Sequence, residues 1–392
     1  MIFKFRNLPK LAGLILVIVL VNSCNYVKNI KLLTGGSVER SNFVETIPFE
    51  YKKDIIVIEA LVNDQDEKRH FILDTGAFES KIEIGLAEKL NLPTKAKKRN
   101  STAQGITKTI EVTRLGKLYL GKTEFSNISA GKLSYDEYSA SKCIAQDGII
   151  GANLMKLAHW RIDYKLQEIQ FSDRPLDYTK EESHVLDFDR PLLSGTPEIE
   201  IKVAGKTISG ILFDIGYNGG LVLPARFSDS FPSLDEKKYY DRSTSGIFGT
   251  NTDTLISKNL DISLGGYKAN LPIGFSAIGK ALLGNDILEH FIVSIDYDRN
   301  KIILQPQSEV YVEQPYSFIP GILNDSLWVV TRTTSDLTFS LGDTLQSING
   351  NKPVNLYSSF CDYSLNIRKL LNGDSLLVTK INGSSIKLDI RN

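Results

Sequence analysis

The feature that most constrains this 392-residue chain is an internal repeat of a β-hairpin pattern that ends in Asp-x-Gly. In the first copy, residues 54–76, an apolar run and a polar turn lead into Phe-Ile-Leu-Asp74-Thr-Gly. In the second copy, residues 196–216, a similar hairpin leads into Ile-Leu-Phe-Asp214-Ile-Gly. Short runs of β-branched and aromatic residues separated by turn residues are typical of strands. Each copy therefore predicts two strands, the second of which ends at an aspartate.

The similarity extends well beyond the two aspartates. Each is followed, in the same order, by a Gly-centred polar segment, a strand ending in Leu-Gly, an aliphatic pair next to glycine, and Ile-Asp-Tyr before an apolar strand. These landmarks are Gly105 and Gly246, 118–121 and 262–265, 148–151 and 282–284, and 162–164 and 295–297. Such a repeat indicates a duplicated structural unit. We predict a mainly β fold with tandem units at 46–178 and 179–307, and one helix at 84–90, where apolar residues share a face.

The sequence changes character after residue 308. The segment Leu341-Gly-Asp-Thr-Leu-Gln-Ser-Ile-Asn-Gly predicts a strand that enters an Asn-Gly hairpin turn, and residues 376–390 predict a closing hairpin. This segment resembles the bacterial PDZ signature. The resemblance implies a small PDZ-like α+β domain at 308–392 that adds a peptide ligand to a sheet edge. Another small β module is the alternative interpretation.

The N-terminus predicts export from the cytoplasm. A basic stretch precedes an apolar run at 11–21, which is shorter than the roughly 20 residues of a membrane span. The run leads into Val-Asn-Ser-Cys24, which resembles a bacterial lipobox, whose cysteine receives a lipid. We expect a lipoprotein signal peptide at 1–23, a membrane anchor at Cys24, a tether at 24–45, and a place in the cell envelope on the periplasm-facing side of the outer membrane. A plain secretory signal with an incidental cysteine is the alternative.

Composition argues against several other functions. The 46 basic residues balance the 46 acidic ones, so the formal charge of +0 gives no electrostatic basis for nucleic-acid binding. Cys143 and Cys361 show neither metal-ligand nor disulfide-framework spacing, and we interpret both as free or buried thiols. Segments similar to a Walker A loop, at 274–280, and to an EF-hand loop, from Asp296, lack essential ligand residues, and the second favours a strand and turn. We predict no metal and no cofactor.

The repeated loops resemble the catalytic loops of the retropepsin and pepsin families of aspartic proteases, over residues 45–306. The first loop, Phe71-Ile-Leu-Asp-Thr-Gly-Ala, carries most of the resemblance. It implies two tandem β-barrel lobes, a catalytic pair of Asp74 and Asp214, and a peptide or protein substrate cleaved by a monomeric chain. Two adjacent carboxyls cannot both ionise, so they share a proton. The ionised one then takes a proton from water while the protonated one polarises the peptide carbonyl.

Residues next to the aspartates match the family pattern only in part. Gly76 and Gly216 permit the tight turns that bring the loops together, and the resemblance implies that the Thr75 hydroxyl braces the opposite loop. Ile215 has no hydroxyl for the reciprocal brace, and Tyr217 replaces a small residue. The rival interpretation is therefore a pseudoprotease, a peptide-binding or scaffolding lipoprotein that keeps the fold without turnover. The second loop is also explained by a plain turn at a strand end.

The Gly-centred segments that follow the aspartates are candidates for flaps that cover substrate and exclude water. Gln104 and Gly105 mark the favoured candidate, and Gly246 marks the second. Ordinary hairpin turns explain the pattern equally well, and neither segment carries the flap tyrosine typical of pepsin-like enzymes. A third functional interpretation is a receptor or assembly lipoprotein that acts mainly through its C-terminal module.

Overall fold

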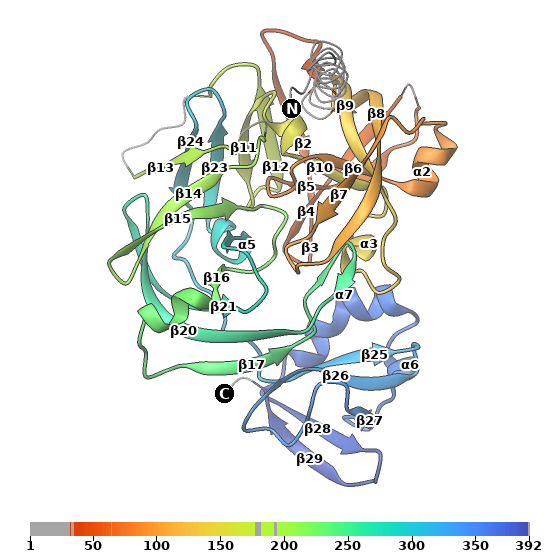
Figure 1. Ribbon diagram of the computed structural model, residues 1–392, viewed down its shortest axis with the longest axis vertical. Coiled ribbons are helices and arrows are strands. Elements are labelled where there is room, and N and C mark those ends of the chain that lie inside the picture. Colours follow the sequence, from red (N-terminus) through yellow and green to blue (C-terminus); the bar gives the residue numbers. More distant parts are fainter. Residues whose placement is uncertain (1–31, 33–34, 64, 177–181, 192–193, 391–392) are drawn as a thin grey trace, which may run out of the picture.

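The structure, a computed structural model, is mainly β, as the sequence predicts (Figure 1). It describes residues 32, 35–63, 65–176, 182–191 and 194–390. The predicted signal peptide, the predicted anchor residue Cys24 and the first part of the tether lie outside these residues. Within the described part of the chain, no helix is both long and apolar enough to span a membrane.

Most strands of the first repeat form a nine-stranded sheet. They are β1 (Ser37–Val38), β3 (Glu50–Lys52), β4 (Ile55–Val62), β5 (Arg69–Asp74), β6 (Ser80–Glu83), β7 (Ala96–Ser101), β8 (Thr107–Leu120), β9 (Thr123–Leu133) and β10 (Gly148–Gly151). The predicted hairpin is β4–β5, and β5 ends at Asp74. β10 runs parallel to β5 with Gly151 opposite Asp74, so the repeated aliphatic-Gly element lies directly beside the aspartate loop.

Short helices accompany this sheet. They are α2 (Ile84–Lys89), α3 (Ala140–Ile144) and α4 (Ala152–Met155). α2 confirms the helix predicted at 84–90. It begins after Glu83, whose side chain accepts a hydrogen bond of 2.8 Å from the Leu86 amide. This bond satisfies one of the amides that the first turn of a helix leaves unpaired.

The second repeat has most of the strand pairings of the first, as expected for a duplicated structural unit. Its elements are β14 (Glu198–Val203), β15 (Lys206–Phe213), β16 (Leu221–Pro224), η1 (Ala225–Ser230), β17 (Lys237–Asp241), β18 (Ser245–Gly246), β19 (Gly249–Thr250), β20 (Asp253–Leu264), β21 (Tyr267–Ser276), β22 (Leu282–Leu283) and α5 (Asn285–Leu288). β14 pairs with β15 as β4 pairs with β5, and β22 runs parallel to β15 as β10 does to β5. Likewise β16 runs parallel to β21 as β6 does to β9.

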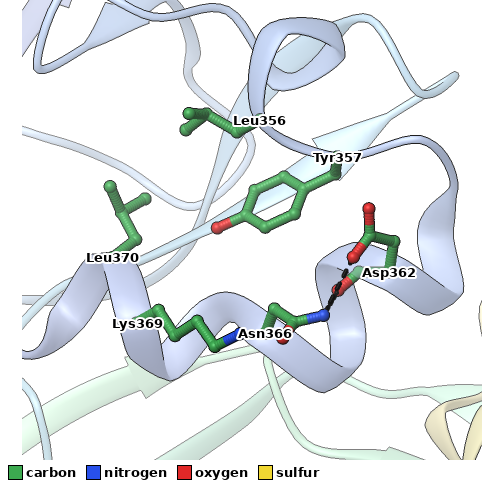
Figure 2. A pocket seen from close by; sticks show the side chains of 6 residues that line it. All are labelled: Leu356, Tyr357, Asp362, Asn366, Lys369 and Leu370. Atoms are coloured by element: carbon green, nitrogen blue, oxygen red, sulfur yellow. Dashed lines mark hydrogen bonds between the residues drawn. The ribbon is translucent and has the colours of Figure 1, made fainter.

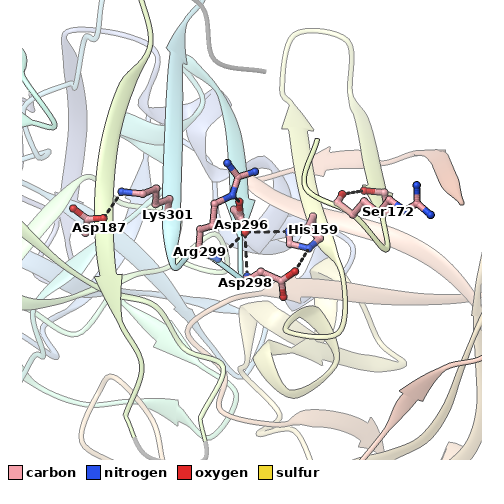
Figure 3. Close-up of polar contacts among 8 residues, drawn as sticks. His159, Ser172, Asp187, Asp296, Asp298, Arg299 and Lys301 are labelled. Carbon is pink, nitrogen blue, oxygen red and sulfur yellow. Dashed lines mark hydrogen bonds and ion pairs between the residues drawn. The ribbon is translucent and has the colours of Figure 1, made fainter. Parts of the chain in front are cut away.

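Matching strands of the two repeats join in a central six-stranded layer. In order across the layer these are β2 (Val44–Pro48), β12 (Glu168–Ser172), β11 (His159–Asp163), β23 (Phe291–Asp296), β24 (Lys301–Pro306) and β13 (His184–Asp189). Asp296, from the repeated Ile-Asp-Tyr, accepts hydrogen bonds from the Asp298 amide (3.0 Å) and the Arg299 amide (2.9 Å), beside His159 (Figure 3). The EF-hand-like segment is therefore a strand and turn, as predicted.

One hydrophobic core runs through both repeats and the central layer. Trp160 illustrates it: the side chain is 1% exposed, stacks on Phe171 with ring centroids 4.9 Å apart, and donates from Nε1 to the Met155 carbonyl. Burial of a large apolar side chain contributes about 1.5–3 kcal/mol. A core that is continuous across the junction therefore holds the two aspartate loops in a fixed relation.

Residues 318–390, here termed the C-terminal unit, have a hydrophobic cluster of their own. The elements are β25 (Ile319–Leu323), β26 (Leu327–Thr334), β27 (Thr344–Ile348), α6 (Pro353–Leu356), α7 (Phe360–Leu371), β28 (Ser375–Lys380) and β29 (Ser385–Asp389). β27 leads into Asn349 and Gly350, both with positive φ, and β28–β29 is the closing hairpin, so the predicted turn and hairpin are confirmed. β26 also pairs with β17, which extends the sheet of the second repeat into this unit.

Cys143 and Cys361 correct the sequence interpretation, which took them as free or buried thiols. They form a disulfide between α3 and α7, with Cα atoms 5.1 Å apart. The cysteines are separated by 218 residues, so nothing in their spacing indicated the pairing. The bond ties the first repeat to the C-terminal unit. The rings of Tyr138 and Phe360 pack edge to face beside it, with centroids 5.3 Å apart.

Candidate active site

Asp74 and Asp214 come together between the two repeats. Asp74 ends the second strand of one hairpin, β5, and Asp214 directly follows the second strand of the other, β15. The carboxyl of each aspartate lies against the glycine of the opposite loop, and the two carboxyls interact with each other. Asp214 is 9% exposed and Asp74 is partly buried. Each loop packs on the other carboxyl, because a Cβ added at Gly76 would collide with Asp214 and one added at Gly216 would collide with Asp74. Glycine at both positions therefore permits the close approach.

Thr75 links the two loops through its hydroxyl. The side chain is fully buried, and Oγ1 donates to the Phe213 carbonyl (2.6 Å) and accepts from the Ile215 amide (3.1 Å). This is the position that the sequence analysis expects for Thr75. Ile215 is also fully buried but offers no hydroxyl to the first loop. The first loop thus bonds to the second through a side-chain hydroxyl, whereas the second loop makes no such bond to the first.

Backbone amides and burial determine the charge of the pair. Asp74 Oδ1 accepts from the Ala77 amide (2.7 Å), and Asp214 Oδ1 accepts from the Gly216 amide (2.9 Å). Burial raises the pKa of Asp74, and the positive charge of Lys81 opposes that rise. Burial and the neighbouring Asp74 raise the pKa of Asp214 well above its ordinary value. Because the pKa is raised at both carboxyls and most strongly at Asp214, the pair shares a proton, and the shifts favour Asp214 as its holder.

The buried Lys81 was not identified from the sequence. It lies in β6, is 4% exposed, and donates from Nζ to the Glu79 carbonyl at 3.3 Å. Burial lowers the pKa of Lys81, and the negative charges of Glu79 and Asp74 oppose the shift. Its sequence context, Ser-Lys-Ile-Glu, is that of an ordinary half-exposed strand, so the pattern carries no signal of this burial.

Asn285, also missed, supports the second aspartate loop from the start of α5. Its Nδ2 donates to the Ile215 carbonyl (2.8 Å) and to the Asp54 carbonyl (2.7 Å), and its Oδ1 accepts from the Tyr164 hydroxyl (2.8 Å). The asparagine is fully buried, and all its amide groups are used. The one available signal was its position directly after the repeated aliphatic-Gly element.

The added bulk of Tyr217 is accommodated by neighbouring glycines. Its ring lies over Gly219 and beside Gly284, where a Cβ on either residue would collide with it. The Tyr217 carbonyl accepts a hydrogen bond of 2.8 Å from the Asn285 amide. The departure from a small residue therefore leaves the backbone bonds of this loop intact.

The two candidate flaps meet in the structure. Residues 102–106 form the tip of the β7–β8 hairpin, where Gly105 has φ +74° and open surroundings. Gly246 lies in the short β18–β19 hairpin, against the side chain of Gln104. Asn251 Nδ2 also donates to the Gln104 carbonyl at 3.1 Å. Gln104 and Gly246 are thus brought together, which the sequence did not predict.

A pocket of about 390 Å³ lies in the C-terminal unit (Figure 2). It is lined by Leu356, Tyr357, Asp362, Asn366, Lys369 and Leu370. On one wall, Asn366 Nδ2 donates to Asp362 Oδ1 at 2.8 Å. None of the predicted catalytic residues lines it, so this pocket is separate from the aspartate pair.

Comparison with known proteins bears on the first repeat. Residues 58–154 match a family model described as aspartyl protease. The matched segment runs from β4 to α4 and contains the Asp74 loop, whereas the Asp214 loop lies beyond it. The match supports an aspartyl protease family and suggests peptide hydrolysis, hence protease activity. A search of the curated proteins finds no match.

Proposed function

We propose that this protein is an aspartic endopeptidase of the cell envelope, which hydrolyses peptide bonds with a water activated by Asp74 and Asp214. The observation that carries the proposal is the contact between these two carboxyls at equivalent positions of a duplicated unit. In this proposal residues 46–178 and 179–307 are two barrel lobes of a single-chain, monomeric protease. Residues 308–392 are a PDZ-like domain.

In the proposed mechanism Asp74 is the base and Asp214 the acid. Asp74 takes a proton from water as the water oxygen attacks the peptide carbonyl carbon, and Asp214 gives its proton to the carbonyl oxygen. The tetrahedral intermediate then collapses: Asp74 protonates the amine nitrogen as the C–N bond breaks, and Asp214 recovers its proton from the hydroxyl. The positive charge of Lys81 supports this division because it favours an ionised Asp74.

The location and the C-terminal role are part of the same proposal. A lipid on Cys24 would hold the protein on the periplasm-facing side of the outer membrane. The disulfide between Cys143 and Cys361 supports a compartment outside the cytoplasm, since cytosolic thiols are kept reduced. The pocket beside α7 supports capture of a peptide ligand or regulation by one.

A second candidate function is a pseudoprotease that binds peptides as a scaffold. Ile215 favours it, because the second loop offers no hydroxyl in return for the one that Thr75 places between the loops. A looser pair would lose the alignment on which general acid–base catalysis depends.

Cleavage of casein by the full-length chain, purified in a mild detergent, tests the proposal. Asp74→Asn and Asp214→Asn should each abolish cleavage between about pH 3 and pH 8, because each removes one partner of the proton transfer. The raised pKa of Asp214 should extend activity above the pH at which an ordinary carboxyl loses its proton. Absence of cleavage by the parent at every pH would favour the scaffold. Loss in Asp74→Asn alone would instead indicate a dimer that pairs two copies of Asp74.

A further inference from the structure

A segment of the second repeat lies on the first repeat, close to Asp74. This segment, residues 245–250, contains β18 and β19 and is termed the latch. Ser139 Oγ donates to the Gly246 carbonyl (3.0 Å), and the Asp136 amide donates to the Ile247 carbonyl (3.2 Å). The backbone of the latch is therefore hydrogen-bonded to the chain that follows β9.

Two apolar side chains of the latch enter apolar surfaces of the first repeat. Phe248 is 4% exposed and packs with Ile110 and Leu133, in a cluster that Ile247 also contacts. Ile247 packs on a second cluster, which Ala77 contacts as well. The members of that cluster are Ile55, Val57, Ile72, Ile144, Ala145 and Ile149.

This second cluster adjoins the catalytic pair. Ile72 is two residues before Asp74 on the same face of β5, and Ile149 of β10 pairs with Ile72. Ala77 donates its amide to Asp74 Oδ1 at 2.7 Å. Ile247 therefore lies on an apolar surface that adjoins Asp74.

The latch contacts the start of α3, and α3 is in turn bonded to the C-terminal unit. Ser245 Oγ donates to the Tyr138 carbonyl (3.1 Å) and accepts from the Ala140 amide (3.3 Å), at the start of α3. Three residues on, Cys143 is bonded to Cys361 of α7. The disulfide therefore fixes the helix on which the latch rests.

The base of the latch is also held by the C-terminal unit. Asp241 accepts hydrogen bonds from the Ser243 amide (3.1 Å) and the Thr244 hydroxyl (2.9 Å), just before the latch begins. The same carboxylate pairs with Arg332 Nε of β26 at 2.9 Å, and Arg332 is 13% exposed at its side chain. The latch is therefore connected to the C-terminal unit in two ways: through α3, which the disulfide joins to α7, and through Asp241, which pairs with Arg332.

We propose that Ile247 and Phe248 occupy the subsites for substrate side chains beside Asp74, and that the latch is an autoinhibitory segment fastened by the Cys143–Cys361 disulfide. This inference rests on the proposed peptidase or peptide-binding function. The substrate class is a peptide with an aliphatic-aromatic pair, which displaces the latch because it offers the same side chains. Reduction by a dithiol loosens the latch: two electrons and two protons convert the disulfide into two thiols while the dithiol becomes a disulfide.

Peptide binding tests the occupancy without requiring turnover. The probe is a fluorescein-labelled octapeptide with Ile-Phe at its centre and Ser and Gly around it, titrated by polarisation into the full-length Asp214→Asn chain. Ile247→Ser in that background should bind about tenfold more tightly, as expected if the closed latch leaves about one molecule in ten competent. Ile381→Ser, at an isoleucine 59% exposed in the C-terminal unit, should not change the affinity. Unchanged or weaker binding by Ile247→Ser would overturn the proposal. Weaker binding would show that Ile247 contacts the bound peptide and does not block its site.

Hydrogen exchange tests the fastening. Amides of residues 245–250 should exchange at least about tenfold faster in a Cys143→Ser, Cys361→Ser chain than in the parent. Dithiothreitol should accelerate the same amides in the parent and leave the double variant unchanged. Equal exchange in parent and variant would show that the disulfide does not fasten the latch. If casein cleavage requires both aspartates but neither the peptide affinity nor the exchange rates change, the autoinhibitory role of the latch is wrong and the peptidase function stands.

Discussion

Thr75→Val removes the hydroxyl with which Thr75 joins the aspartate loops and nearly preserves the side-chain shape. The Thr75 side chain is fully buried, so water cannot replace its bonds to the Phe213 carbonyl and the Ile215 amide. A buried backbone group that loses its partner costs about 1–3 kcal/mol. With two such groups, we expect the free energy of unfolding to fall by about 2–6 kcal/mol. Thr75→Ser keeps the hydroxyl and loses one methyl group, for a smaller cost of about 1 kcal/mol.

Urea unfolding of the two variants and the parent, followed by tryptophan fluorescence, measures this difference. Trp160 lies in the core shared by both repeats, so its signal reports the relevant unfolding. A difference of at least about 1 kcal/mol between Thr75→Val and Thr75→Ser supports a hydroxyl that spans the loops. If Thr75→Val is no less stable than Thr75→Ser, the brace contributes nothing and the reasoning fails.

Two further predictions concern the second repeat. Ile215→Thr should supply the missing hydroxyl and make casein cleavage faster. The gain of about 1 kcal/mol per hydrogen bond roughly offsets the lost apolar burial, so the free energy of unfolding should stay within about 1 kcal/mol of the parent. Slower cleavage at unchanged stability would contradict this prediction. Burial and the nearby Asp54 raise the pKa of Asp286 from 3.8 to about 7, so the folded state loses stability as pH rises through that interval, and the full loss is present above it. Asp286→Asn should therefore raise the melting temperature at about pH 8 and have little effect near pH 4, whereas equal shifts at both pH values would refute the assignment.

Local patterns accounted for the elements that depend on neighbouring residues. The hairpins that lead to Asp74 and Asp214 follow from alternating apolar residues and polar turns, and α2 follows from its apolar face. The duplication was visible because both copies keep the same landmarks. The position of Thr75 followed from the family resemblance and not from any local pattern.

Contacts between distant segments could not be inferred in this way. The pairing of Cys143 with Cys361 depends on how α7 packs against α3, and no local pattern records that packing. The burial of Lys81 likewise depends on the strands around it, because the same residue would be ordinary on an exposed strand. The contact between Gln104 and Gly246 arises only when the two repeats close on each other.

The pairing of β26 with β17 has a consequence for how this chain tolerates shortening. β17 pairs on one side with β20 and on the other with β26. A chain ending near residue 308 would expose the backbone of Tyr239, Tyr240 and Asp241, which pair with β26, as an open sheet edge. Such edges pair with other molecules, so the shortened protein would tend to aggregate. Loss of function after that truncation would therefore report insolubility as much as the loss of a binding module.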